Sequence, residues 1–218
     1  MVAIGLLLPA FCPVLVAVGP SLPAFCPILV AVGPYYYLVK HLSVSGKENI
    51  PKDTQVVIVS NHFSYWDPPI LCIATRKPVC YIAKKELFAH PHFAALIKLL
   101  GAVAIDRKKP SLSSIKKIKE AIQAGWSLGI FIEGTRSKIE GSMGQPHTGA
   151  AYFAHTYKLP ILPIGLLDTI RKDGKFQARI GKLIEPGENL EAKTWEIMHA
   201  LSELTGYKLP AQTVLDRG

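Results

Sequence analysis

The sequence predicts an α/β protein with a mostly parallel or mixed central sheet flanked by helices. Six short runs rich in Val, Ile and Leu have the length and composition of buried strands, and segments of helical length lie between them. At 218 residues, the chain is long enough to form one sizeable core. A third observation sets the N-terminus apart, because no charged side chain precedes Lys40.

The elements follow in order along residues 40–218, which we take as one domain. A turn-rich stretch at 46–51 leads into the first strand, a β-branched run, and Asp-Pro-Pro then begins a helix. We expect strands at 55–60, 79–83, 102–105, 128–132, 161–167 and 178–184. We expect helices at 68–75, 92–100, 111–125, 147–157 and 190–204. In helix 111–125 an isoleucine stripe opposes a lysine face, which is typical of a helix on a core.

Residues 1–39 are predicted to form a separate apolar segment that associates with a membrane. Within it, residues 8–20 recur as residues 22–34 with one change, Val14 to Ile28. Prolines break both copies into pieces shorter than the ~20 residues of a spanning helix, and the start lacks the basic residues of a signal peptide. We therefore favour an interfacial or re-entrant anchor. An apolar cap over the core and an inessential duplication are the alternatives.

The formal charge of +9 is concentrated in one stretch. Between Arg76 and Lys119 there are eleven Lys or Arg against Glu86 and Asp106. Such a stretch attracts anionic lipid headgroups, phosphorylated substrates or an acidic carrier protein. No nucleic acid is expected, since neither a basic-aromatic platform nor a recognition helix accompanies the charges. The four cysteines have no Cys-x-x-Cys spacing, which argues against a disulfide framework or a zinc site.

A histidine and an aspartate five residues apart follow the first predicted strand. His62 falls in the loop at the strand's carboxyl end, where α/β proteins usually bind ligands. Pro68 and Pro69 have no N–H groups, so we expect Asp67 to accept from the imidazole and not from its own helix. A histidine oriented by a carboxylate can take a proton from a hydroxyl. Considered alone, this spacing more often marks a loop histidine and a helix-capping aspartate.

Polar or charged residues also end three later strand-like runs, and neighbouring strands would gather them around one crevice. The runs are 101–107, 129–137 and 159–165. Arg107 and Arg136 each offer a bidentate fork for a phosphate, and Gly134 would let backbone N–H groups approach an anion. We expect Glu133 to fix an arginine or to accept from a substrate hydroxyl. Taken singly, Asp106-Arg107 is more typical of a surface ion pair, and residues 133–137 of a turn.

The order of these blocks resembles the glycerolipid acyltransferase family, most closely the 1-acylglycerol-3-phosphate acyltransferases. The matching blocks are Asn61–Asp67, Gly101–Arg107, Phe131–Ser137 and Leu159–Pro163, with a lysine-containing segment that begins at Lys84. The resemblance covers residues 40–185. Ile132 stands where these enzymes often have proline, which a strand tolerates. The residues before Gly149 lack a lysine that relatives often carry, which weakens the case for one phosphate or acyl-donor contact.

The resemblance implies that His62 deprotonates the sn-2 hydroxyl of a lysophosphatidic acid. The hydroxyl then attacks an acyl thioester, and phosphatidic acid is formed. Asp67 would orient His62, and Lys84 or backbone N–H groups would stabilise the oxyanion. The glycerol phosphate would be held by Arg107, Glu133, Gly134, Thr135 and Arg136. The reaction requires no metal and no bound cofactor, because acyl-CoA or acyl-carrier protein acts as a co-substrate.

Lipid substrates imply a membrane-associated protein at the cytoplasmic face, or at its equivalent in an organelle. The expected partners are membrane lipids, lysophosphatidic acid and, as one candidate donor, an acyl carrier protein. Other interpretations stay open. In one interpretation, the acyl acceptor is glycerol 3-phosphate or another lysolipid. In a second, the protein binds lipid without turnover. In a third, it is a hydrolase in which His62 activates water. The presence of both His62 and Asp67 argues against the protein without turnover.

Overall fold

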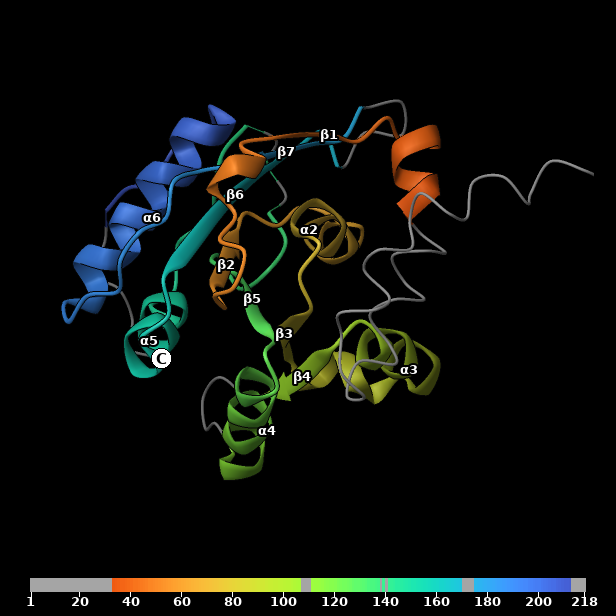
Figure 1. Ribbon diagram of the computed structural model, residues 1–218, viewed down its shortest axis with the longest axis vertical. Helices are drawn as coiled ribbons and strands as arrows, with labels where there is room; N and C mark the ends of the chain where they lie inside the picture. The colour runs from red at the N-terminus through yellow and green to blue at the C-terminus, as the bar shows by residue number, and fades with distance from the viewer. Residues whose placement is uncertain (1–32, 107–110, 138, 140, 170–174, 213–218) are drawn as a thin grey trace, which may run out of the picture.

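A seven-stranded sheet forms the centre of the computed structural model, which describes residues 33–106, 111–137, 139, 141–169 and 175–212 (Figure 1). The strands are β1 (Ser43–Ser45), β2 (Val57–Ser60), β3 (Val79–Lys84), β4 (Ala102–Ile105), β5 (Ser127–Phe131), β6 (Ile161–Leu167) and β7 (Gln177–Ile180). Their spatial order is β1-β7-β6-β2-β5-β3-β4. Only the β6–β7 pair is antiparallel within these described strands. The mixed α/β sheet predicted from the sequence is thereby confirmed.

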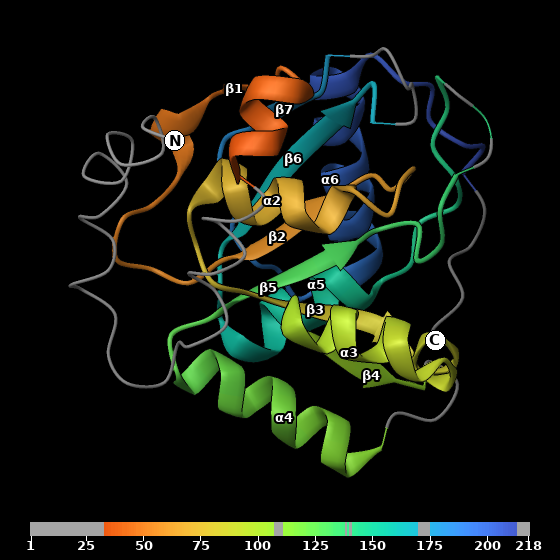
Figure 2. The ribbon, with the colours of Figure 1, turned by 90° about the vertical axis from the view of Figure 1, so that its right-hand side faces the viewer.

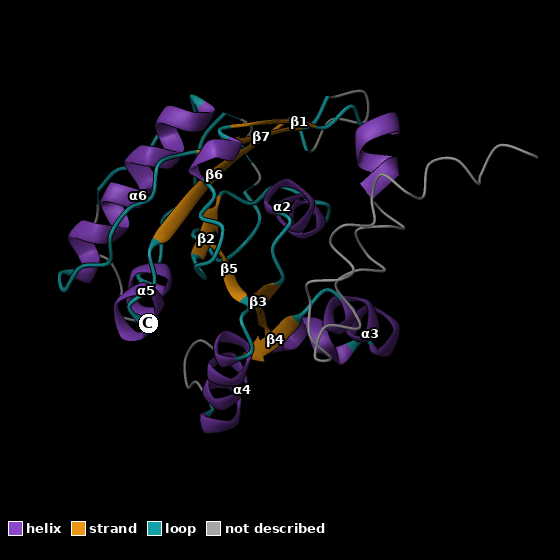
Figure 3. Cartoon of the chain, in the orientation of Figure 1, coloured by secondary structure: helices purple, strands orange, loops and turns teal. Residues whose placement is uncertain are grey.

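Helices cover both faces of the sheet, as Figure 3 shows. The α-helices are α2 (Asp67–Thr75), α3 (Pro91–Leu99), α4 (Leu112–Gln123), α5 (Gly149–Tyr157) and α6 (Leu190–Thr205). Three shorter helices are η2 (Tyr35–Val39), η3 (Lys47–Asn49) and η4 (Lys85–Ala89). The five predicted α-helices are confirmed, with ends that differ by one or two residues.

The core consists of two apolar clusters, one on each face of the sheet. In β2, Ile58 packs with α2 and η2, whereas Val57 and Val59 pack with α4, α5 and α6. Figure 2 shows α2 and η2 in front of the sheet and α5 and α6 behind it. Because successive strand residues point to opposite faces, a strand covered on both sides is apolar on both faces along most of its length. This explains the uninterrupted β-branched run from which β2 was predicted.

Two details of the sheet differ from the prediction. The three-residue β1 was not expected, since the turn-rich sequence around it carries little strand signal; it pairs with β7. The last predicted strand, 178–184, ends early at Ile180. After it, Gly181 donates to the carbonyl of Pro163, and Ile184 forms an isolated antiparallel bridge with Ile161. The chain therefore leaves the regular ladder after Ile180 and returns only at that bridge.

The carboxyl ends of the central parallel strands meet at one edge of the sheet. Ser60, the last residue of β2, pairs with Phe131, the last residue of β5. Lys84, at the end of β3, pairs with Ile105 at the end of β4. The segments that follow these strands therefore start from the same edge, where ligands bind in open α/β sheets.

The predicted membrane-associating segment, 1–39, lies mostly outside the described residues. Its described end, η2, places the ring of Tyr36 in the core and leaves Leu38 and Val39 exposed. Across the described residues, we find no helix that is both long enough and apolar enough to span a bilayer.

Candidate active site

His62 and Asp67 lie in direct contact at the carboxyl edge of the sheet. His62 lies in the loop between β2 and α2, and its Nδ1 is 2.8 Å from Oδ2 of Asp67, the first residue of α2. The His62 side chain is 17% exposed and that of Asp67 is fully buried. Because a carboxylate only accepts hydrogen bonds, Nδ1 carries the proton and Nε2 is the basic nitrogen. The contact expected from the sequence is thus present, and it fixes the tautomer that a general base needs.

The carboxylate of Asp67 also organises the loop that carries the histidine. Oδ2 accepts from the backbone N–H groups of Phe63 at 2.7 Å and of Ser64 at 2.8 Å. The two prolines that follow Asp67 provide no donors, so the carboxylate bonds to the residues before it and not to its own helix. The other oxygen, Oδ1, is buried and has no hydrogen-bond partner among the described residues.

An aromatic stack fixes the plane of the imidazole. The His62 ring lies 3.9 Å from the ring of Phe131, at an interplanar angle of 18°. Phe131 in turn stacks on Tyr81, whose hydroxyl donates to the carbonyl of Pro68 at 2.6 Å. Burial raises the pKa of Tyr81, so its hydroxyl stays a donor to the start of α2. The histidine is therefore held by hydrogen bonding at Nδ1 and by packing on its face.

Glu133 joins the histidine loop to the segment after β5. Its side chain is 3% exposed; Oε1 accepts from the N–H of His62 at 3.3 Å and Oε2 from the N–H of Gly144 at 2.7 Å. Burial raises the pKa of this carboxyl group, while the backbone donors oppose the rise. The sequence suggested an arginine or a substrate hydroxyl as its partner. Among the described residues, its hydrogen-bond partners are two backbone donors and no arginine, a pairing that depends on the fold and not on local spacing. Acceptance from a substrate hydroxyl stays a prediction.

The turn after Glu133 returns to the histidine. Gly134 has φ of 63°, a left-handed conformation that glycine adopts without strain, and its N–H donates to the carbonyl of Phe131. That N–H is thus engaged within the turn, and the predicted approach of other backbone N–H groups to an anion at Gly134 stays a prediction. Ser137 donates from its backbone to the carbonyl of His62 at 2.7 Å. Thr135 is exposed and lines a cavity of about 370 Å³ beside Glu133.

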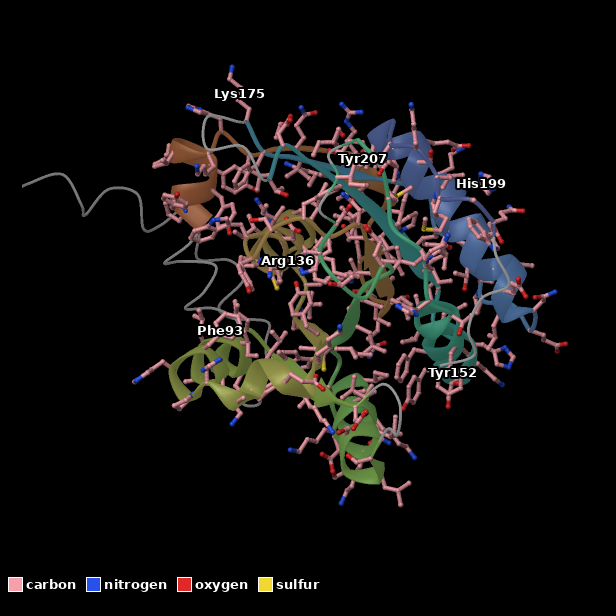
Figure 4. All side chains as sticks on the ribbon, turned by 180° about the vertical axis from the view of Figure 1, so that it is seen from behind. Phe93, Arg136, Tyr152, Lys175, His199 and Tyr207 are labelled. Atoms are coloured by element: carbon pink, nitrogen blue, oxygen red, sulfur yellow. The ribbon has the colours of Figure 1, made fainter. Side chains whose placement is uncertain are left out.

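Arg136 is exposed on this turn and stacks on an aromatic ring. Its Cζ lies 3.8 Å from the ring centroid of Tyr65, and Nη2 donates to the Tyr65 hydroxyl at 2.9 Å. Among the described residues, no carboxylate lies within ion-pairing distance of this guanidinium. Figure 4 shows Arg136 near the middle of the molecule. Its position, between the histidine loop and solvent, suits an anion-binding group.

Of the two remaining predicted residues, the structure describes Lys84 but not Arg107. Lys84 ends β3 at the same edge of the sheet and is exposed, and no described hydrogen bond joins it to the histidine loop. Its neighbour Lys85 forms an ion pair with Asp106. Arg107 lies outside the described residues. The roles of both residues stay predictions.

Sequence reasoning missed Asn61, which precedes the histidine and is fully buried. Its side-chain amide donates to the carbonyl of Leu166 at 2.8 Å and accepts from the N–H of Leu166 at 2.8 Å. Asn61 thus extends the β2–β6 pairing by one step at the strand's end. The available signal in the sequence was a polar amide residue placed directly between an apolar strand and the histidine. A buried amide in that position requires hydrogen-bond partners, which indicates a structural role.

The mixed sheet and the carboxylate-supported histidine at its carboxyl edge are those of an α/β enzyme that can activate a hydroxyl group. The family model described as Acyltransferase matches residues 41–167, more than half of the chain. The chain belongs to the acyltransferase family.

Individual relatives agree with this assignment. The chain is 28% identical over 174 residues to the Bacillus subtilis 1-acyl-sn-glycerol-3-phosphate acyltransferase, covering 77% of this chain and 86% of that protein. It is 33% identical over 163 residues to the Pseudomonas aeruginosa protein of the same name, covering 73% of this chain and 60% of that one. The crystal structure of the Thermotoga maritima 1-acyl-sn-glycerophosphate acyltransferase, PlsC, shows the same fold, with a TM-score of 0.62. The two chains are 24% identical, and the match covers 83% of this chain and 79% of that one.

Proposed function

We propose that this protein transfers an acyl chain from an acyl thioester to the sn-2 hydroxyl of 1-acylglycerol 3-phosphate, giving phosphatidic acid for phospholipid synthesis. One observation carries the proposal: the 2.8 Å contact of His62 with Asp67, which leaves Nε2 as a base at the carboxyl edge of the sheet. The acceptor is inferred from the names of the Bacillus and Pseudomonas relatives. Acyl-CoA and acyl-carrier protein are both candidate donors.

The chemistry requires one base that later acts as an acid. Nε2 of His62 takes the proton of the acceptor hydroxyl as its oxygen attacks the thioester carbonyl. When the tetrahedral intermediate collapses, the C–S bond breaks and the imidazolium returns the proton to the leaving thiolate. Asp67 stabilises the imidazolium between these steps, and a base of this kind contributes about 10²–10⁴ in rate. Lys84 or backbone N–H groups are our candidates for stabilising the oxyanion.

Arg136 is the described residue best suited to bind the phosphate of the acceptor. It lies on the turn that is bonded to the backbone of His62 and is exposed, with no carboxylate partner among the described residues. Arg107, which follows β4 in the sequence, is our second candidate. Glu133 and Gly134 shape the turn, and Thr135 lines the adjacent cavity. Guanidinium groups bind phosphate through paired, charge-assisted hydrogen bonds.

Transfer assays with a panel of acceptors test the proposal. Thiol release should depend on 1-acylglycerol 3-phosphate and exceed release with glycerol 3-phosphate or a phosphate-free lysolipid. Release that continues without any acceptor would indicate a hydrolase, and binding without turnover would indicate a lipid-binding protein. His62→Ala should abolish transfer, whereas His199→Ala, an exposed histidine on α6 labelled in Figure 4, should not. Full activity in His62→Ala would reject the mechanism.

We also infer that the protein associates with the cytoplasmic face of a membrane, or its organelle equivalent, through residues 1–39. Support comes from the uncharged repeat, the lipid nature of the substrates and the exposed Leu38 and Val39. Deleting residues 1–34 should move the protein from the membrane fraction to the soluble fraction. The deletion must stop there, because Tyr36 is part of the core. Unchanged membrane partition would reject the anchor.

A further inference from the structure

The contact between Tyr65 and Arg136 joins two segments that are 71 residues apart in sequence. Tyr65 is 55% exposed, so burial does not force its ring into this position. The ring covers one face of the guanidinium at 3.8 Å, and the hydroxyl accepts one of its N–H groups at 2.9 Å. Two different interactions therefore restrain the same cation.

A tyrosine restrains an arginine without neutralising it. An aspartate or glutamate in the same place would use two donors and cancel the charge, and it would compete with a bound phosphate. The tyrosine hydroxyl uses one of the five guanidinium donors, and the ring covers a face that has no N–H groups. The remaining in-plane donors and the full positive charge stay available for an oxyanion. The pairing is suited to an arginine that binds an anionic ligand.

Tyr65 is itself held by its neighbours. Its ring makes an edge-to-face contact with Phe93 of α3, with centroids 5.6 Å apart and an interplanar angle of 78°. The backbone beside it is fixed by Asp67, which accepts from the N–H of Ser64, and by Trp66, which donates to the Ser64 hydroxyl at 3.2 Å. The residue that holds the arginine therefore belongs to the loop that holds the catalytic base.

These contacts set the position of the guanidinium relative to the imidazole. The backbone N–H of Ser137, next to Arg136, donates to the carbonyl of His62. On the side-chain side, Arg136 donates to the hydroxyl of Tyr65, which belongs to the same loop as His62. The acceptor carries its reacting hydroxyl and its phosphate on adjacent glycerol carbons, so the base and the cation must keep a fixed separation. From this geometry we infer that Tyr65 is a positioning residue that holds Arg136 for the acceptor phosphate. The inference rests on the function proposed above.

The test uses the full-length enzyme and three variants of two exposed tyrosines. Tyr65→Leu removes both interactions and should raise the apparent KM for 1-acylglycerol 3-phosphate about tenfold, with kcat changed by less than about twofold. Tyr65→Phe keeps the ring and should raise KM by about threefold or less. Tyr152→Leu, an exposed tyrosine on α5, is the matched control and should behave like the wild type. Figure 4 shows Tyr152 well apart from Arg136 and Phe93.

Two further measurements separate positioning from a general disturbance of the loop. With a phosphate-free lysolipid as acceptor, Tyr65→Leu should match the wild type. In an Arg136→Ala background, Tyr65→Leu should raise KM no further, because the tyrosine acts through the arginine. An equal loss with both acceptors, or additive effects in the double variant, would overturn the inference. A wild type that does not acylate the phosphorylated acceptor would instead refute the proposed function.

Discussion

Replacing Asp67 by asparagine tests the central pair of the site most directly. Oδ2 of Asp67 accepts from Nδ1 of His62 and from two backbone N–H groups, at 2.7 to 2.8 Å. Hydrogen bonds to a charged group contribute about 1.5–3 kcal/mol and neutral ones about 0.5–1.5 kcal/mol. The two backbone bonds should therefore lose about 2 kcal/mol together when the carboxylate becomes an amide.

The amide group adds a second penalty. If the asparagine oxygen keeps the three donors, its NH₂ takes the place of Oδ1, which is buried and has no hydrogen-bond partner within the described part of the chain. Leaving a buried donor unpaired costs about 1–3 kcal/mol, whereas removing a buried charge offsets part of the loss. We expect the free energy of unfolding to fall by about 2 kcal/mol, as measured by urea denaturation.

The effect on activity should be larger than the effect on stability. A neutral amide neither stabilises the imidazolium nor enforces the proton on Nδ1, and the equivalent change in a serine protease triad lowers kcat about 10⁴-fold. We expect a loss of about 10³–10⁴ in kcat here, measured by thiol release with saturating acceptor. Asp53→Asn, an exposed aspartate before β2, is the control and should leave kcat unchanged. A kcat for Asp67→Asn within tenfold of the wild type would refute the reasoning.

Two further substitutions test the support around the pair. Glu133→Gln presents an NH₂ to one of two backbone donors, so we expect a loss of about 1–3 kcal/mol in unfolding free energy and a lower kcat. Because burial raises the pKa of Glu133 above 4.5, the folded wild type binds this proton more tightly than the unfolded chain does. We therefore expect the unfolding free energy of the wild type, relative to that of Glu133→Gln, to decrease as the pH rises through the pKa of Glu133. Urea denaturation at several pH values measures this difference, and an increase with pH would contradict the raised pKa. Gly129→Ala would place Cβ 2.5 Å from the Tyr81 ring and should destabilise by about 1–3 kcal/mol in thermal unfolding. Gly149→Ala, where the space is open, should change stability by less than about 1 kcal/mol, so equal effects would reject the packing argument.

The elements of the fold were predictable because the sheet is covered on both faces. β2 is buried throughout and β6 at all but its last residue, so their sequences are almost entirely apolar and stand out from the helices between them. β1 could not be predicted in the same way. It has three residues, two of them exposed serines, and it forms only through pairing with β7. A strand whose stability depends on a distant partner leaves little local signal.

The site shows the same division between local and distant information. The contact of His62 with Asp67 followed from their spacing and from the prolines after Asp67, all within one short stretch of sequence from the loop after β2 to the start of α2. The partners of Glu133 and Arg136 did not follow, because they lie 71 residues upstream or on a separate loop. The residue types indicated the chemistry of these side chains. Only the pairing of β2 with β5 determines which groups meet.

The backbone of His62 is bonded at both its N–H and its carbonyl to the segment 133–137. The two sequence blocks Asn61–Asp67 and Phe131–Ser137 are therefore held together in the structure, although each is recognised separately in the sequence. A homologous block exchanged alone would carry its own geometry for the turn and would shift the base with it. Redesign of acceptor preference in this enzyme should exchange both blocks together, or leave the Glu133 and Ser137 contacts unchanged.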